Sequence, residues 1–223
     1  MNYKAIIFDM DGTIICTELM WQQATHKILD IYAGHLSAHE RKEINTYLKG
    51  LAVYESCKYI AQHAKTPVSV DEIRATKSKI AHDLYETQGL NFIPFFPEFH
   101  AKTQKYNLKT AIATNAIEQT VEKTLKFLPL RDFFGEHIYN IDMVNKVCKP
   151  DPTIFLHAAK NIGVDPQNCI VIEDSVHGIK AAKAAGMYCI AINTGNDRHL
   201  LGQADEIVDC YTHINLEKLL YNK

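Results

Sequence analysis

Four short runs of consecutive apolar residues stand out along the chain: residues 5–9, 110–114, 169–174 and 188–193. Consecutive apolar positions, as opposed to alternating ones, are typical of strands that are buried on both faces in a parallel sheet. Weaker runs at residues 137–141 and 206–208 are candidates for two further strands. The pattern therefore predicts a sheet that lies between layers of helices.

Segments with apolar residues at helical spacing follow most of these runs: residues 117–127, 153–161, 176–185 and 215–221. Strands that alternate with helices predict parallel strands joined by helical crossovers. The fold class that we expect is therefore α/β, with a doubly wound, mostly parallel, Rossmann-like sheet.

Residues 17–88 break this alternation, because they contain no clear strand-like run. Their apolar residues recur at helical spacing, for example at Ile73 and Leu84. Ser69, followed three residues later by Glu72, forms a capping box that marks the start of a helix within this stretch. The pattern predicts an insert of four helices.

The insert divides the expected fold into two parts. We expect a helical cap domain at residues 17–88 and a Rossmann-like catalytic core made of residues 1–16 and 89–223. Residues 89–97 contain a glycine and two prolines, a composition typical of a linker, and they mark the return to the core.

Polar residues stand at the ends of the predicted strands and in one loop: Asp9, Asp11, Thr114, Asn115, Lys149, Glu173 and Asp174. In open α/β sheets, ligands bind beyond the carboxyl ends of the strands, so we expect these side chains to converge. The backbone N–H groups that open the helix after Thr114 are expected to add an anion site.

This set of side chains indicates phosphoryl-transfer chemistry. Clustered carboxylates repel one another unless a cation neutralises them, and oxygen ligands without histidine or thiolate suit Mg²⁺. An aspartate can attack phosphorus, and a second carboxylic acid can protonate the leaving oxygen. A lysine together with hydroxyl and amide donors can hold the phosphoryl oxygens.

Each of these residues taken alone has a simpler explanation. Asp9 and Asp11 are common in turns, Glu173 and Asp174 can cap a helix, and a single lysine is usually a solvated surface residue. The combination at consecutive strand ends favours one joint site. No P-loop pattern is present in the chain, so a nucleotide cradle of that type is not expected.

Composition narrows the class of partner. The chain has 24 basic and 26 acidic residues, a net charge of −2, with no long run of one sign, so we expect no nucleic-acid partner. No stretch approaches the roughly 20 apolar residues of a membrane span, and we expect neither a membrane partner nor a secretory signal.

The six cysteines are far apart, which favours reduced thiols in a cytoplasmic protein. We expect a monomer or weak dimer that binds a small phosphorylated metabolite.

Four motifs together resemble the haloacid dehalogenase superfamily: D-M-D-G-T, A-T-N, K-P-D-P and I-E-D-S-V-H-G-I-K-A-A-K-A-A-G-M, which begin at residues 9, 113, 149 and 172. The branch that they resemble carries an inserted helical cap and includes β-phosphoglucomutase and many sugar-phosphate phosphatases. The resemblance covers the whole core in the order expected for that branch.

The resemblance implies a role for each carboxylate. Asp9 is expected to be the nucleophile and a Mg²⁺ ligand, and Asp11 the general acid and base, with its backbone carbonyl on the metal. Asp174 is expected to be a further metal ligand, with Glu173 in or beside the metal shell.

The resemblance also implies how phosphate is held. Thr114 is expected to bind the transferring phosphoryl group with support from Asn115, and Lys149 to neutralise the nucleophile and the phosphate. Gly12 belongs to the same phosphate-binding set, at a sharp departure from the strand where a side chain would crowd the site.

Asp11 distinguishes between the reactions of the superfamily. The dehalogenases lack this second aspartate and use no metal, and the phosphonate-cleaving members also dispense with it. The presence of Asp11 therefore disfavours both reactions and leaves phosphatase and phosphomutase.

The sequence of the predicted cap distinguishes less clearly between a phosphatase and a phosphomutase. Leu48, Lys49 and Gly50 resemble the cap loop of the mutase, but the mutase has an arginine three residues later, where this chain has Val53. Hydrolysis of a small phosphomonoester is the first expectation, with a mutase or a non-catalytic phosphometabolite-binding protein as alternatives. Glu18, Trp21 and Lys49 are the candidate specificity residues.

Overall fold

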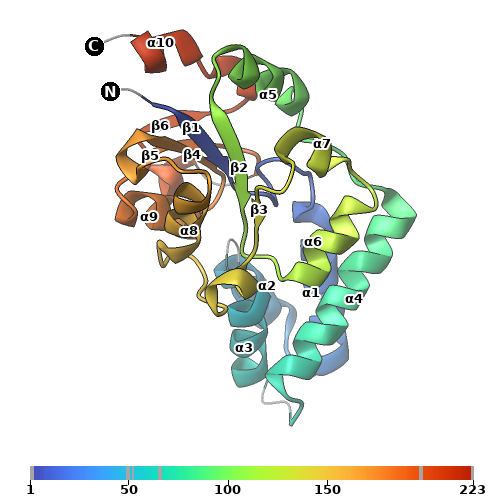
Figure 1. Ribbon diagram of the computed structural model, residues 1–223. Coiled ribbons are helices and arrows are strands. Elements are labelled where there is room, and N and C mark those ends of the chain that lie inside the picture. Colours follow the sequence, from blue (N-terminus) through green and yellow to red (C-terminus); the bar gives the residue numbers. More distant parts are fainter. Residues whose placement is uncertain (1–2, 49–50, 52, 65–66, 196–197, 222–223) are drawn as a thin grey trace. The chain divides into compact units, whose positions relative to one another are not determined.

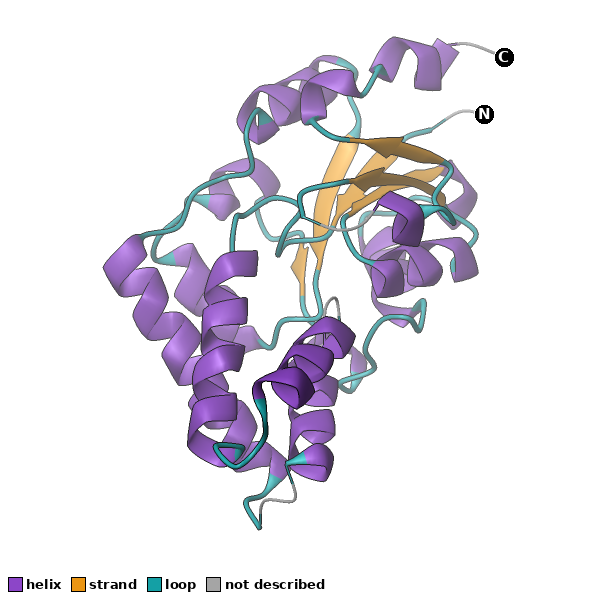
Figure 2. Ribbon diagram, turned by 180° about the vertical axis from the view of Figure 1, so that it is seen from behind, coloured by secondary structure: helices purple, strands orange, loops and turns teal. Residues whose placement is uncertain are grey.

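The computed structural model describes residues 3–48, 51, 53–64, 67–195 and 198–221. The chain forms two compact units. One consists of Met1–Cys16 and Asn91–Lys223, and the other of Thr17–Leu90. The first unit contains all six strands of the sheet, and the second is helical (Figures 1 and 2).

The sheet has the strand order β3-β2-β1-β4-β5-β6, and every neighbouring pair is parallel. Its strands are β1 (Ala5–Phe8), β2 (Lys109–Ala113), β3 (Ile138–Tyr139), β4 (Cys169–Glu173), β5 (Tyr188–Ile192) and β6 (Glu206–Val208). The six expected strands are therefore all present. The central strand β1 is flanked by β2 and β4, the arrangement of a doubly wound sheet, which confirms the predicted fold class.

The helices of this unit and its 3₁₀ turns lie between successive strands, except η4 and α10, which follow β6. The helices are α5 (Phe96–Lys105), α6 (Glu118–Leu125), α7 (Leu130–Phe134), α8 (Thr153–Asn161), α9 (Val176–Ala184) and α10 (Leu216–Tyr221). The 3₁₀ turns are η1 (Ile141–Val144), η2 (Pro166–Asn168), η3 (Arg198–Leu201) and η4 (Tyr211–His213).

Both faces of the sheet are covered, which explains why the strands are consecutively apolar. Successive residues of a strand point to opposite faces. Ile7 belongs to a core cluster that also contains Phe155 of α8 and Ile179 of α9. The next residue, Phe8, packs edge-on against Phe96 of α5, with 5.7 Å between ring centroids. Helices α8 and α9 thus cover one face of the sheet, and α5 covers the other (Figure 1).

Helix α5 was not expected, because its start lies within residues 89–97, which we interpreted as a linker. Phe95 takes a left-handed backbone conformation with φ of 67°, and the helix begins at the next residue. Pro97 stands in the first turn, where a missing backbone N–H costs nothing. The proline that indicated a loop is therefore part of a helix start.

His100 of α5 is a buried histidine on this aromatic face, and it carries the first testable prediction. Its Nε2 lies 3.1 Å from Thr110 Oγ1, and burial lowers its pKa to about 4. The unfolded chain binds the proton more readily, so stability should fall as the pH drops from about 6.5 towards 4. The loss should approach about 3 kcal/mol over that range.

Urea unfolding of wild type and His100→Gln at several pH values between 7 and 4.5 measures this effect. The variant should show a flatter dependence of unfolding free energy on pH, because the titrating group is gone. His39 is exposed, so His39→Gln serves as the matched control and should keep the wild-type slope. Equal slopes for wild type and His100→Gln would contradict the prediction.

The helical unit consists of α1 (Glu18–Tyr32), α2 (Ala38–Leu48), α3 (Val53–His63) and α4 (Val70–Gln88). It has a core of its own, which includes Ile28, Ile60 and Ile73. Ser69 caps α4 by accepting a hydrogen bond of 3.2 Å from the backbone N–H of Glu72, as its sequence pattern predicts.

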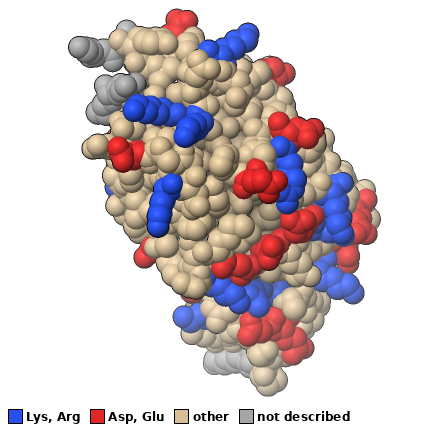
Figure 3. All heavy atoms as spheres, viewed as in Figure 1, with Lys and Arg blue, Asp and Glu red and all other residues tan. Residues whose placement is uncertain are grey.

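No helix in the described part of the chain is both long and apolar enough to span a bilayer. On the face of the molecule shown in Figure 3, lysine and arginine side chains are interspersed with aspartate and glutamate.

Candidate active site

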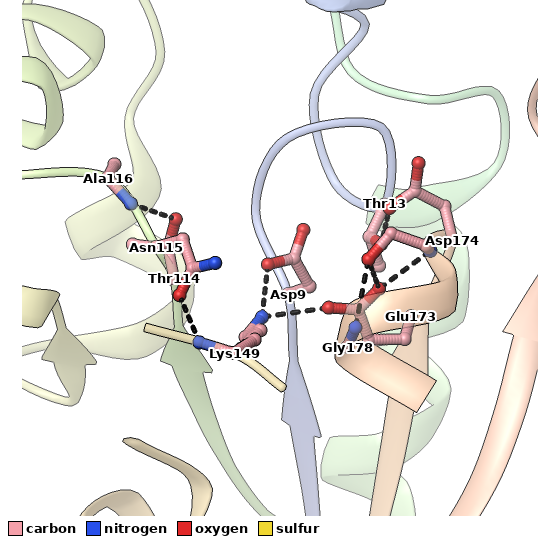
Figure 4. A network of polar contacts seen from close by, with 10 residues as sticks. Asp9, Thr13, Thr114, Asn115, Ala116, Lys149, Glu173, Asp174 and Gly178 are labelled. Atoms are coloured by element: carbon pink, nitrogen blue, oxygen red, sulfur yellow. Dashed lines mark hydrogen bonds and ion pairs between the residues drawn. The ribbon is translucent and has the colours of Figure 1, made fainter. Parts of the chain in front are cut away.

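The candidate site lies at the carboxyl ends of three neighbouring strands (Figure 4). Asp9 follows β1, and its backbone N–H donates to the carbonyl of Ile172 in β4 at 2.9 Å. Thr114 follows β2, and Glu173 is the last residue of β4. The parallel register brings these three strand ends to one edge of the sheet, as the sequence predicts.

Lys149 joins two of the carboxylates. It comes from the loop before α8, is buried, and donates from Nζ to Asp9 Oδ1 at 2.5 Å and to Glu173 Oε1 at 2.8 Å. The ammonium group also lies 4.6 Å from the centroid of the Phe155 ring. Burial lowers the pKa of Lys149, but Asp9 and Glu173 raise that pKa by more, so the lysine is charged.

Asp9 is in a different electrostatic position. Burial raises its pKa, Lys149 lowers it, and the nearby Glu173 and Asp11 raise it again, with a net increase. The cluster thus contains more negative charge than its single lysine balances. A bound cation would relieve that imbalance.

Three carboxylates can contribute to a cation site. Asp9, Glu173 and Asp174 each offer an oxygen, and these oxygens all lie within 4.8 Å of one another. Such a set of hard oxygen ligands fits Mg²⁺, which binds through one or two carboxylates and keeps several waters. The residues present therefore fit the cation that the sequence predicts.

Glu173 already has protein partners for both of its oxygens. Oε1 accepts from Lys149, and Oε2 accepts from the backbone N–H of Ser175 at 2.8 Å and from its hydroxyl at 2.9 Å. Its side chain is fully buried. Glu173 is therefore held in place by the protein at both of its oxygens.

Gly178 makes room for Glu173, and the sequence analysis did not single it out. A Cβ atom at position 178 would lie 1.7 Å from Glu173 Oε1 and 1.8 Å from Cδ. The residue is in the first turn of α9, where its N–H donates to the N-cap Ser175, and glycine in a helix is less favourable than alanine by up to about 1 kcal/mol. A glycine within a helical pattern is a signal of close packing, and it could have indicated this contact.

Gly12 has the same relation to Asp174. Its φ is +80°, and a Cβ atom there would lie 2.3 Å from Asp174 Oδ2. Thr13, the next residue, donates from Oγ1 to Asp174 Oδ1 at 3.4 Å. The close approach predicted at Gly12 is therefore present, and the crowding group is a carboxylate of the cluster. Asp11, directly before Gly12, is half-buried, and its backbone forms an isolated parallel β-bridge with that of Ile15.

Thr114 and Asn115 support the site from β2. The hydroxyl of Thr114 accepts from the backbone N–H of Ala116 at 3.0 Å, an arrangement that leaves the hydroxyl hydrogen able to donate to a ligand. Asn115 Oδ1 accepts from the backbone N–H of Lys149 at 2.9 Å and ties the lysine loop to the strand end.

The predicted anion site at the start of the helix after Thr114 is partly occupied by groups of the protein itself. Helix α6 begins only at Glu118, whose backbone N–H donates to Asp142 Oδ2 at 2.8 Å. The N–H of Ala116 is bound by Thr114. Two of the expected donors are therefore already satisfied within the protein.

The candidate specificity residues belong to the helical unit. Glu18 begins α1 and accepts from Gln22 Nε2 at 2.9 Å. Trp21 is half-buried, and its backbone carbonyl accepts from the hydroxyl of Thr25 at 2.8 Å. Lys49 lies outside the described residues. Their role in specificity stays a prediction.

Comparison with known proteins places these motifs in one family. Residues 6–192 match the family of haloacid dehalogenase-like hydrolases. A bifunctional riboflavin kinase/FMN phosphatase from Arabidopsis thaliana is 30% identical over 96% of the chain, which spans only 55% of that relative's length. A β-phosphoglucomutase from Bacillus subtilis is 30% identical over 97% of the chain and 93% of its own length.

A solved structure shares the fold of the chain. The crystal structure of a family IA, variant 3 hydrolase of the same superfamily from Entamoeba histolytica matches with a TM-score of 0.85 and 23% identity, and the match covers 97% of each chain. The motifs, the strand-end cluster and the family match agree on one conclusion. The chain belongs to the haloacid dehalogenase-like hydrolase family.

Proposed function

We propose that this protein is a Mg²⁺-dependent phosphatase that hydrolyses a small phosphomonoester through an aspartyl-phosphate on Asp9. The observation that carries the proposal is the position of Asp9 at the end of β1. This carboxylate lies beside the ammonium group of Lys149 and within 4.8 Å of other acidic groups suited to a cation. A buried aspartate in such surroundings is suited to attack an anionic substrate, which it would otherwise repel.

In the first step, an oxygen of Asp9 attacks phosphorus, and the bond between phosphorus and the leaving oxygen breaks. Asp11 gives its proton to that oxygen, so the leaving group departs as a neutral alcohol. The hydroxyl of Thr114 and the ammonium group of Lys149 stabilise the charge on the phosphoryl oxygens.

In the second step, a water molecule attacks the phosphorus of the aspartyl-phosphate and passes a proton to Asp11. The bond between Asp9 and phosphorus breaks, which releases inorganic phosphate and restores both carboxyl groups. Splitting the transfer in this way replaces one difficult step with two easier ones.

Asp9 and Asp174 would hold Mg²⁺, with the backbone carbonyl of Asp11 as a further ligand. When bound, the ion supplies positive charge that offsets the charge of the carboxylates and of the substrate phosphate. Glu173 accepts a hydrogen bond from Lys149 and so fixes the position of the ammonium group. Lys149 in turn donates to the nucleophile Asp9.

The helical unit has a proposed role as a cap over the reaction, as in the branch that the sequence resembles. A lid of this kind keeps stray water from the aspartyl-phosphate until the acceptor is in place. Within this proposal, Glu18, Trp21 and Lys49 contribute to substrate choice. A lid also limits substrate size, which favours metabolites over proteins.

A phosphomutase of the β-phosphoglucomutase type is the second candidate, supported by the similarity to the Bacillus subtilis enzyme. A mutase must retain a bisphosphate intermediate, and position 53, where the mutase has an arginine, is Val53 here. Hydrolysis makes no such demand and is the better-supported reaction. A non-catalytic phosphometabolite-binding protein would not need a nucleophile beside a buried lysine. The pair of Asp9 and Lys149 therefore favours an enzyme over that alternative.

A panel of phosphorylated metabolites, assayed for released phosphate with Mg²⁺, tests the proposal. Removal of the metal with EDTA should lower the rate by at least about 100-fold, and added Mg²⁺ should restore it. Ca²⁺ prefers more ligands at longer distances and serves as the matched control, because it should restore less activity.

Phosphate release that persists unchanged in EDTA would contradict the metal requirement. If no compound releases phosphate but a sugar phosphate is isomerised when a bisphosphate primer is added, the protein is a mutase and the phosphatase proposal is wrong. If neither reaction occurs but the folded protein binds phosphorylated compounds, the binding role replaces both.

A further inference from the structure

Two hydroxyl groups from the C-terminal part of the core hold the loop that follows β1. Thr194 donates from Oγ1 to the carbonyl of Gly12 at 2.7 Å. The hydroxyl of Tyr211 donates to the carbonyl of Thr13 at 2.9 Å. Thr194 follows β5, and Tyr211 begins η4 just after β6, so both reach the loop from the carboxyl ends of neighbouring strands.

Tyr211 is rigidly placed. It is 1% exposed, and its ring packs against Phe99 and Phe96 at centroid distances of 5.0 and 5.7 Å. Burial raises the pKa of Tyr211, and the charges of Asp9 and Asp174 raise it further. The hydroxyl therefore keeps its proton at neutral pH and can donate the hydrogen bond to Thr13.

The two contacts act on the consecutive peptide groups Gly12–Thr13 and Thr13–Ile14, which begin one residue after Asp11. The loop itself closes through a hydrogen bond of 2.8 Å from the N–H of Gly12 to the carbonyl of Ile15. Thr13 also donates from its side chain to Asp174. The backbone that carries Asp11 is thus fixed from outside the loop as well as from within it.

We propose that Tyr211 and Thr194 are positioning residues that hold the backbone after Asp11 so that its carboxyl group meets the leaving oxygen. The inference rests on the proposed function, because it assumes that Asp11 is the general acid. Neither residue touches the reacting atoms in this assignment. Their effect passes through the carbonyls of Gly12 and Thr13.

The dependence of rate on the leaving group separates this role from a merely structural one. 4-Nitrophenol leaves readily from a phosphate ester and needs little protonation, whereas phenol is a poorer leaving group and depends on the general acid. A variant with a displaced Asp11 should therefore lose more activity towards phenyl phosphate than towards 4-nitrophenyl phosphate. A variant that is partly unfolded loses the same fraction of activity towards both.

The experiment compares kcat/KM for these two esters in wild type, Tyr211→Phe, Thr194→Val and the double variant. This quantity reports steps up to the formation of the aspartyl-phosphate, before Asp11 acts as a base. For phenyl phosphate, the double variant should lose about 100-fold, since a misplacement of about 1 Å has this effect. For 4-nitrophenyl phosphate, the loss should stay below about tenfold.

Tyr106→Phe is the matched control. The hydroxyl of Tyr106 is on the surface of the same unit and donates to Glu217 at 3.1 Å, away from the cluster. This variant should keep the wild-type rate for both esters. Thermal unfolding of all variants measures the folded fraction, which cancels in the ratio of the two rates.

Equal losses for the two esters in Tyr211→Phe and Thr194→Val, or no loss at all, would overturn the positioning role while leaving the phosphatase intact. If wild type hydrolyses neither these esters nor any compound of the metabolite panel, the proposed function fails, and the positioning role fails with it.

Discussion

Replacement of Asp9 by asparagine is expected to lower kcat by at least about 10⁴-fold, since the loss of a nucleophile removes the covalent route altogether. The amide has nearly the same shape as the carboxylate, but it is a far weaker nucleophile. Steady-state phosphate release with the best substrate of the panel measures the loss. Acid quenching of the wild type during turnover should trap phosphate on the protein, and the variant should trap none.

Asp132→Asn is the control for this substitution. Asp132 is exposed in the first turn of α7, so the same chemical change there should leave both activity and trapped phosphate unchanged. A rate for Asp9→Asn within about tenfold of the wild type would rule out Asp9 as the nucleophile. The expected effect requires that the variant stays folded, and circular dichroism checks this point.

The second large effect is expected at Gly178. Helix propensity alone predicts that Gly178→Ala stabilises the protein by about 1 kcal/mol. The new methyl group would lie 1.7 Å from Glu173 Oε1, in a site where Glu173 is fully buried and accepts hydrogen bonds from Lys149 and Ser175. Moving the carboxylate breaks these charged contacts, so we expect a net destabilisation of at least about 3 kcal/mol, together with a strong loss of activity.

Urea unfolding at pH 7 measures the sign as well as the size of this effect. Gly202→Ala is the matched control, because among the described residues a Cβ atom at that position would meet only the carbonyl of His199, at 3.4 Å. Its unfolding free energy should change by less than about 1 kcal/mol. A Gly178→Ala variant that is as stable as the wild type, or more stable, would show that Glu173 can move at little cost.

The sequence predicted the sheet well because a strand buried on both faces needs an unbroken apolar run. The four strongest runs and the two weak ones all became strands, each within a residue or two of its expected bounds. The same reasoning brought Asp9, Thr114 and Glu173 to one edge, since parallel strands end on the same side. Helix α5 was missed because its proline and its left-handed N-cap at Phe95 resemble a loop.

Other parts of the site could not be predicted from local pattern. Tyr211 and Thr194 meet the loop after β1 across most of the length of the chain, and nothing near them in the sequence indicates that contact. Gly178 signals close packing within its helix, but the sequence does not show that Glu173 is the group packed against it. Such contacts depend on how close two segments come in three dimensions, which periodicity does not encode.

The hydrogen bonds of Lys149 have one more consequence. An ammonium group has three hydrogens, and within the described part of the chain two of them are directed at Asp9 and Glu173. In the proposed mechanism the third would donate to an incoming phosphoryl oxygen, so the lysine would bind substrate without releasing either carboxylate. Its orientation is set before the substrate arrives, and the reaction needs no rearrangement of this charge. In this respect the site is preorganised, and the energy that orders it is supplied by folding.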